Sequence, residues 1–192
     1  VKNPVNRLVD GSVKLYRRKS NKTIDPVPME TLVEYDIAGV DFSAGITITG
    51  LQGDRINGAM KVEFVGSGGI STQDVKVRVN GDSGSNYTEQ YLRGNGSSAS
   101  SSSSTRDSMR FQNIRAESTY ELWLYPKSGQ NRPALSNVSS DAVTSQSIYR
   151  QAHWWSNTAD EINRIDIFAS NTNPITGTIR ISVPKGTKMA SP

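Results

Sequence analysis

Short segments in which apolar and polar residues alternate recur along most of the chain, and they restrict its fold more than any other feature. In the first half the alternation runs through residues 32–37, 46–49, 60–64 and 75–79. In the second half it runs through residues 109–111, 120–124, 165–167 and 179–183. Successive side chains of a β-strand point to opposite faces, so a period of two predicts strands that bury one face. A helix requires a different spacing.

Segments rich in Gly, Asn, Asp and Ser separate these strands, at residues 50–58, 66–69, 80–86 and 171–177. Gly and Asn tolerate the positive φ of tight turns. Roughly nine or ten short strands joined by turns predict an all-β fold, an antiparallel β-sandwich of jelly-roll type, because two stacked sheets let each strand bury one face in a shared core. Residues 140–146 and 158–163 are the candidates for short helical turns.

The length and composition predict one soluble domain without covalent cross-links. The chain has 192 residues and no Cys, which excludes a disulfide scaffold, Cys-based zinc sites and a Cys nucleophile. It is 34% apolar and 21% charged, more polar than an average domain. No apolar run approaches the ~18 residues of a membrane span, and charges interrupt the first segment where a cleaved signal peptide needs an apolar stretch.

The net charge of the chain is concentrated at its N-terminus. Residues 1–30 hold seven basic and three acidic residues, which accounts for the whole net charge of +4. Two prolines, Pro26 and Pro28, mark the end of this segment. We therefore divide the chain into a basic extended N-terminal arm (1–30), a β-sandwich domain (31–186) and a C-terminal tail (187–192).

A basic arm on a neutral body attracts an acidic protein surface or a nucleic acid, or is simply solvated. Tyr16 is the only aromatic residue of the arm. Binding of single strands depends on aromatic residues interleaved with basic ones, so a nucleic acid is the less favoured partner.

Residues for catalysis are scarce. The single histidine, His153, lies in the run Ala152-His153-Trp154-Trp155, a setting that favours a structural role. One His and no Cys argue against a transition-metal site, and no cofactor or enzymatic activity is expected. Residues 80–86 place oxygen donors at alternating positions but lack the multiple carboxylates and the terminal Glu of a calcium-binding loop, so a hydrogen-bonded turn is expected there. Asp160, Glu161 and Asp166 do not predict a paired-carboxylate site.

Two further segments have open interpretations. Residues 94–105 consist almost entirely of Gly, Ser and other small polar residues, which predicts a surface loop, either a flexible spacer or an ordered tip of the sandwich. Tyr149, Trp154 and Trp155 are candidates for stacking on sugar rings. Adjacent strand residues face opposite ways, so at most one of the two tryptophans faces solvent, and packing in the core or an interface is the main alternative.

Several motifs resemble a group of virion proteins of tailed bacteriophages. They are the turn Asn80-Gly81-Asp82-Ser83-Gly84-Ser85-Asn86-Tyr87 after a Val-rich strand, then Tyr91-Leu92, then Gly94-Asn95-Gly96-Ser97-Ser98-Ala99-Ser100. Residues 48–54 resemble the Gly-Leu-x-Gly-Asp turn of that group, and residues 165–182 its closing pair of strands. The resemblance covers about residues 40–183. The basic arm and the ending Val183-Pro184-Lys185-Gly186 depart from the shared pattern.

The resemblance implies a jelly-roll-like domain on the exterior of a virion, as a capsid decoration (cement) protein, a head fibre or a tail-associated module. The expected function is non-enzymatic docking on the major capsid protein, by a chain that forms a homo-oligomer, a dimer or trimer, and contacts no membrane. The docking candidates are Lys14, Tyr16, Arg17, Arg18, Lys19 and Lys22, and residues 12–17 have the alternation needed for strand addition. The alternative is a fibre module that binds host glycan through Tyr149, Trp154 and Trp155 or the Ser-rich segment.

Overall fold

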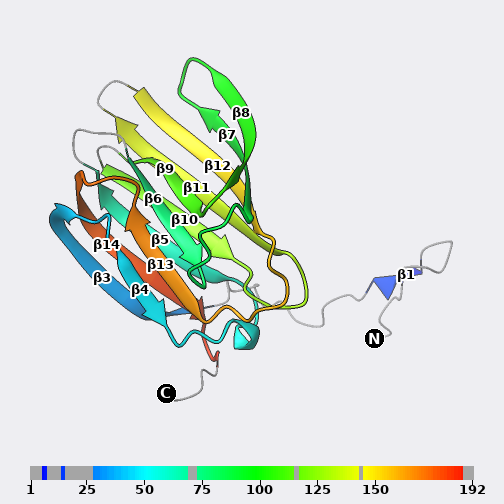
Figure 1. The fold of residues 1–192 in the computed structure, drawn as a ribbon. Coiled ribbons are helices and arrows are strands. Elements are labelled where there is room, and N and C mark those ends of the chain that lie inside the picture. Colours follow the sequence, from blue (N-terminus) through cyan, green and yellow to red (C-terminus); the bar gives the residue numbers. More distant parts are fainter. Residues whose placement is uncertain are drawn as a thin grey trace.

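The strands predicted from the alternation form two packed antiparallel sheets (Figure 1). The computed structural model describes residues 6–7, 14–15, 28–68, 73–114, 117–142 and 145–187. The first half contains β1 (Asn6–Arg7), β2 (Lys14–Leu15), β3 (Met29–Asp41), β4 (Ile46–Thr49), β5 (Met60–Ser67), β6 (Gln73–Val79) and β7 (Tyr87–Gly94). The second half contains β8 (Ala99–Arg106), β9 (Met109–Ile114), β10 (Glu117–Leu124), β11 (Arg132–Ala142), β12 (Ser145–Trp155), β13 (Arg164–Ala169) and β14 (Pro174–Pro184). The described residues include one 3-10 turn, Gly53–Arg55, and no α-helix.

The strand order is that of a jelly roll with two insertions. The larger sheet has the order β3-β14-β5-β10-β11-β12-β7-β8, and the smaller has the order β4-β13-β6-β9. Strands pair in nested fashion, β6 with β9, β5 with β10, β4 with β13 and β3 with β14, as in a long hairpin rolled into two layers. The predicted all-β sandwich is therefore confirmed, and the last two strands, β13 and β14, lie in different sheets.

The insertions are two hairpins that widen the larger sheet. β7 and β8 follow β6, β11 and β12 follow β10, and the four strands continue the larger sheet beyond β10. We call β3, β14, β5 and β10 the jelly-roll half of this sheet, and β11, β12, β7 and β8 the extension. The outer face is the face of the larger sheet turned away from the smaller sheet.

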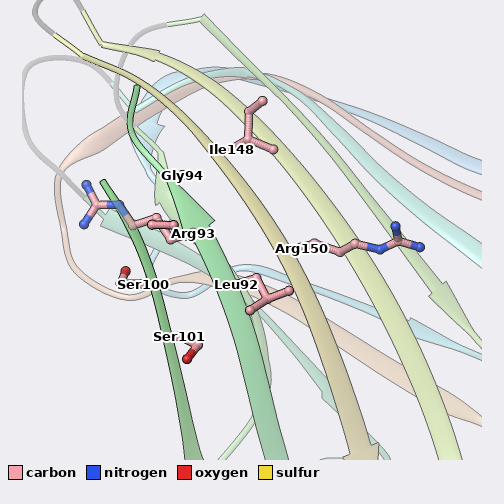
Figure 2. A pocket seen from close by; sticks show the side chains of 8 residues that line it. Leu92, Arg93, Gly94, Ser100, Ser101, Ile148 and Arg150 are labelled. Atoms are coloured by element: carbon pink, nitrogen blue, oxygen red, sulfur yellow. The ribbon is translucent and has the colours of Figure 1, made fainter. Parts of the chain in front are cut away.

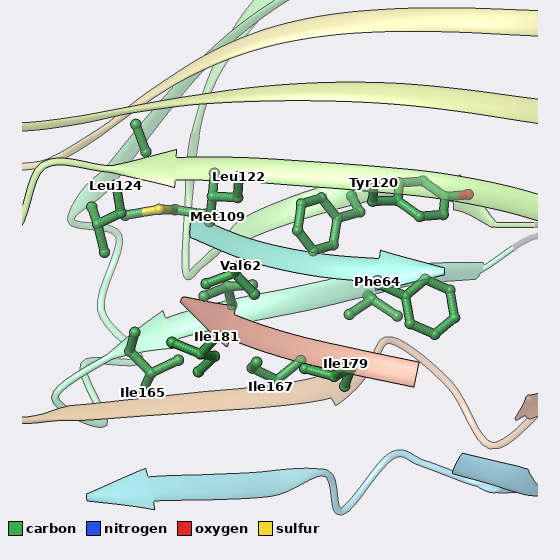
Figure 3. Close-up of a cluster of buried hydrophobic side chains, with 14 of the residues drawn as sticks. Val62, Phe64, Met109, Tyr120, Leu122, Leu124, Ile165, Ile167, Ile179 and Ile181 are labelled. Carbon is green, nitrogen blue, oxygen red and sulfur yellow. The ribbon is translucent and has the colours of Figure 1, made fainter. Parts of the chain in front are cut away.

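The core lies between the two sheets and is built from the apolar positions of the alternating strands (Figure 3). Val62 and Phe64 of β5 and Ile179 and Ile181 of β14 face it from the larger sheet, and Ile167 of β13 lies in the same cluster. All five are almost completely buried. Burying a side chain of this size contributes about 1.5–3 kcal/mol, so this cluster holds the two layers together.

The expected loop over residues 94–105 is wrong, because residues 99–106 form the strand β8. β8 pairs with β7 in one unbroken register, from Tyr87 opposite Arg106 to Gly94 opposite Ala99. Backbone hydrogen bonds to β7 hold this strand although its side chains add nothing to a core. The turn between the two strands is closed by Asn95, whose Oδ1 accepts the backbone N–H of Ser98 at 2.9 Å.

The expected helical turns are also absent from the described residues. Residues 140–142 and 145–146 belong to β11 and β12, whose pairing continues to the end of the hairpin. Residues 158–163 form bends and irregular backbone. At the first of these two positions, strand pairing across the β11–β12 hairpin takes the place of the expected helical turn.

The body of the sheet begins close to the predicted boundary of the arm, since β3 starts at Met29. Within the arm, β1 and β2 pair in antiparallel fashion, with Arg7 opposite Lys14. The other docking candidates, Tyr16, Arg17, Arg18, Lys19 and Lys22, lie outside the described residues, as does most of the segment 12–17. In the described part of the chain, no helix is long and apolar enough to cross a membrane.

Candidate functional site

The outer face of the extension exposes large apolar side chains. Leu92 of β7 is 61% exposed, Ile148 of β12 is 68% exposed, and Trp154 of β12 is 36% exposed. These residues point outward because they alternate with inward neighbours such as Tyr149 and Trp155. We call Leu92, Ile148 and Trp154 the apolar outer patch. Leu92 and Ile148 are diagonal neighbours on paired strands, and Trp154 lies further along β12, beyond Arg150 and Ala152. Exposed apolar side chains on one open face make that face a candidate contact surface.

A shallow hollow of about 520 Å³ lies at one end of this patch, over strands β12, β7 and β8 (Figure 2). Arg150 stands opposite Leu92, and Ile148 stands opposite Gly94, which has no side chain to fill the space. Ser101 of β8 contributes a hydroxyl to the rim. The hollow therefore combines an apolar floor with one outward guanidinium.

Arg150 is the charged group of this hollow that lies on the outer face. It forms no ion pair with another described residue. Arg93 turns to the opposite face, where its guanidinium lies 5.4 Å from the centre of the Tyr149 ring. A second hollow, of about 430 Å³, shares Ile148 and continues across β11 and β10 to β5. Ile148 thus stands between two depressions of one continuous face.

The three aromatic candidates for glycan binding do not lie together. Tyr149 and Trp155 are each 1% exposed. The Tyr149 ring packs at 6.3 Å from that of Tyr91, and the Trp155 ring stacks at 6.4 Å on that of Tyr87. Trp154 alone of the three offers part of its ring to solvent, and Pro133 and Thr88 stand beside it on the neighbouring strands.

The inner face of the extension carries a buried polar network around Glu89. Arg110 of β9 donates to both carboxylate oxygens of Glu89, at 2.8 and 2.9 Å, and to Asp74 at 2.9 Å. Gln112 donates to the same carboxylate at 3.1 Å. Burial alone raises the pKa of Glu89, but the hydrogen bonds and charge of Arg110 outweigh burial and hold that pKa below its ordinary value. The network therefore contains a buried, paired carboxylate.

Ser136, His153 and Glu89 lie in the order that a nucleophile, a base and its carboxylate would take. Ser136 Oγ is 3.3 Å from His153 Nε2, and His153 Nδ1 is 4.0 Å from Glu89 Oε2. However, all three residues are 0% exposed, so no substrate reaches the hydroxyl. Burial lowers the pKa of His153 to about 4 and keeps the ring neutral. These contacts fit the structural role expected for His153.

The turn over residues 80–86 is tied by hydrogen bonds, as predicted. Asp82 Oδ1 accepts the backbone N–H of Gly84 at 2.9 Å, and Asp82 Oδ2 accepts the indole N–H of Trp155 at 2.7 Å. Burial raises the pKa of Asp82, but these donors outweigh burial and lower the pKa overall. Across the described ranges, no cluster of three or more His, Cys, Asp or Glu side chains can hold a metal ion.

The carboxylates at residues 160–166 engage separate partners. Asp160 accepts from the Asn157 amide, and Asp166 accepts from the Thr47 hydroxyl.

Comparison of the chain with protein-family models, with curated proteins and with solved structures found no match. Within the apolar outer patch, the sequence singled out Trp154 as a binding candidate but not Leu92 or Ile148, whose exposure depends on the sheet.

Proposed function

We propose that this protein is a non-enzymatic structural protein of a tailed-phage virion, a capsid decoration or cement protein that docks on the particle exterior through its N-terminal arm. The observation that carries the proposal is the apolar outer patch, Leu92, Ile148 and Trp154, on a rigid β-sandwich. Such a patch contributes by burying surface against another protein and requires no reacting group. The motifs of residues 80–100 and 48–54, which resemble tailed-phage virion proteins, support the same class.

The arm and the body have different tasks in this proposal. The arm carries the whole net charge of +4, so it is attracted to an acidic surface of the major capsid protein. Its basic and aromatic residues, Lys14, Tyr16, Arg17, Arg18, Lys19 and Lys22, are the docking candidates. The body then adds contact area and rigidity, and stabilises the shell by bridging subunits.

The test is rebinding of the isolated protein to capsids stripped of it. We expect binding that weakens as salt increases, because salt screens the attraction between arm and shell. Deleting residues 1–24 is expected to abolish rebinding, and replacing Leu92 and Ile148 by Ser is expected to weaken it without changing its salt dependence. Unchanged rebinding after the deletion would remove the arm from the mechanism.

The exposed ring of Trp154 favours a second candidate function, a fibre module that binds host surface glycan. Aromatic rings stack on the apolar faces of sugars, and Trp154 lies beside Pro133 on an open face. This alternative predicts binding to lipopolysaccharide or wall glycan that is lost in Trp154→Ala. Tyr125→Ala is the matched control, since Tyr125 is an exposed aromatic residue outside the extension. Equal binding by both variants would exclude this candidate.

A further inference from the structure

Among the described strands, β8 is the outermost of the larger sheet and pairs only with β7 (Figure 1). At the turn, Asn95 N–H donates to the Ser98 carbonyl at 3.2 Å. Residue pairs of an antiparallel ladder alternate between hydrogen-bonded and non-hydrogen-bonded pairs, so the backbone N–H and C=O groups of every second residue of β8 point away from β7. Counting from the turn, these residues, which we call the open residues, are Ala99, Ser101, Ser103 and Thr105.

The other long edge of this sheet is protected against pairing, whereas β8 is not. β3 carries Glu30, Glu34 and Asp36, and its register with β14 shifts twice. Charged side chains and bulges of this kind prevent a second strand from pairing. β8 reads Ala-Ser-Ser-Ser-Ser-Ser-Thr-Arg, has no proline and no register shift against β7, and is uncharged up to Arg106.

We propose that a second copy of this chain pairs with β8 through its own β8, in antiparallel fashion across a two-fold axis. The register that uses all four open residues places Ser102 on the axis. Ser101 then lies opposite Ser103 of the other copy, and Ala99 lies opposite Thr105. This pairing forms about eight backbone hydrogen bonds. Arg106 lies opposite Ser98, so no two charges of like sign meet.

Charge and composition favour a second copy over the basic arm as the occupant of this edge. β8 carries no acidic residue, and Arg106 at its end and Arg93 on the neighbouring β7 are positively charged, so this edge offers no attraction to a segment that carries a net charge of +4. Two β8 strands, in contrast, present uncharged small residues to each other. Serine is a poor strand former, so a second ladder of hydrogen bonds stabilises β8 itself.

The paired dimer joins the two extensions into one surface. A two-fold axis perpendicular to the sheet keeps both outer faces on the same side, so the hollows that contain Leu92 and Ile148 lie on either side of the axis. The contact consists of one short strand edge from each copy, so we expect weak association, in the micromolar range, that depends on concentration. This pairing is independent of docking on a capsid.

Cross-linking through an introduced cysteine tests the register, because the chain has no Cys of its own. Ser102→Cys places two thiols on the axis, at an open pair whose Cα atoms lie within the ~4.4–6.8 Å that a disulfide requires. We expect a disulfide-linked dimer under mild oxidation. Ser97→Cys, in the turn of the same hairpin, lies far from its copy in this register and is the control. Equal cross-linking of both variants, or none in Ser102→Cys, would overturn the proposal.

Sedimentation velocity over a concentration series tests the edge without oxidation. The double variant Ser101→Lys/Ser103→Lys sets lysines opposite each other, and we expect complete loss of the dimer. Thr88→Lys/Gln90→Lys adds the same charge to the outer face of β7 and is expected to remain dimeric. A wild-type chain that stays monomeric at millimolar concentration, or a dimer that survives the lysines on β8, would refute the pairing. Deleting residues 1–24 leaves the dimer intact, which separates this test from the rebinding assay.

Discussion

The two halves of the larger sheet differ in where their ion pairs lie. On the jelly-roll half the outer face carries ion pairs, such as Arg180–Glu34 at 2.6 Å and Lys61–Glu121 at 2.8 Å, and the inner face is apolar. On the extension the outer face exposes Leu92 and Ile148, and the inner face holds the Glu89 network.

This difference follows from what covers each half. The smaller sheet has four strands, and its last strand, β9, sends Arg110 and Gln112 to Glu89 of the extension. At this margin of the sandwich, long polar side chains fill the space that apolar side chains fill elsewhere. The outer face of the extension has no charged network among its described side chains, and in the proposed function it is the face that contacts another protein.

The largest effect is expected from breaking the polar network. Glu89→Ala leaves the partly buried Arg110 guanidinium without its main partner, and removing one member of a buried ion pair destabilises by about 3–5 kcal/mol. Urea unfolding followed by tryptophan fluorescence measures this change. Glu121→Ala on the outer face of the jelly-roll half is the control, with an expected loss below about 1 kcal/mol because Glu121 is 41% exposed. Equal losses would show that the network is not structural.

The next largest effect concerns the stability at acidic pH. Burial lowers the pKa of His153 from 6.5 to about 4, so the unfolded chain binds more protons than the folded chain between these values. The free energy of unfolding therefore falls as pH decreases from 6.5 to 4, by about 3 kcal/mol. The lowered pKa of Glu89 adds a loss in the same direction at still lower pH. In His153→Gln we expect a flatter profile from pH 6.5 to 4, and an unchanged slope would assign the loss to other groups.

A smaller effect is expected at the turn that leads from the jelly roll into the extension. Asp82→Ala removes the acceptor of the indole N–H of Trp155, a residue that is almost completely buried. A buried donor left without a partner costs about 1–3 kcal/mol. Asp82→Asn retains a side-chain oxygen and is expected to lose less. Thermal unfolding of both variants checks the order, and a neutral Asp82→Ala would mean that the turn does not anchor Trp155.

The jelly-roll half is the part of the fold that the sequence predicts well. Its strands bury one face and expose the other, so residues 60–64 and 179–183 show the period of two directly. The extension hides this signal. In β12 the inward positions include Gln151 and His153, while Ile148 and Trp154 point outward. Apolar residues therefore occur on both faces of this strand, and its sequence shows no clear alternation. β8 has no apolar pattern at all and is held by its backbone.

The candidate site was predictable only in part for the same reason. Alternation along one strand predicts that Trp154 and Trp155 face opposite ways, as the structure shows. Nothing in the local pattern tells which of the two is outward, because that depends on which side the smaller sheet covers. The juxtaposition of Leu92 with Arg150 depends on the pairing of β7 with β12, which are far apart in sequence.

The smallest expected effects concern how salt changes the stability of variants on the outer faces of the jelly-roll half and of the extension. Lys61→Met removes ion pairs to Glu63 and Glu121, and we expect a loss of less than about 1 kcal/mol that shrinks as salt increases. Ile148→Ser removes an exposed apolar side chain, and we expect a change within about 0.5 kcal/mol at every salt concentration. Urea unfolding at low and high salt measures both. A clear loss of stability in Ile148→Ser would mean that this side chain supports the fold, and the apolar outer patch would then no longer indicate a contact surface.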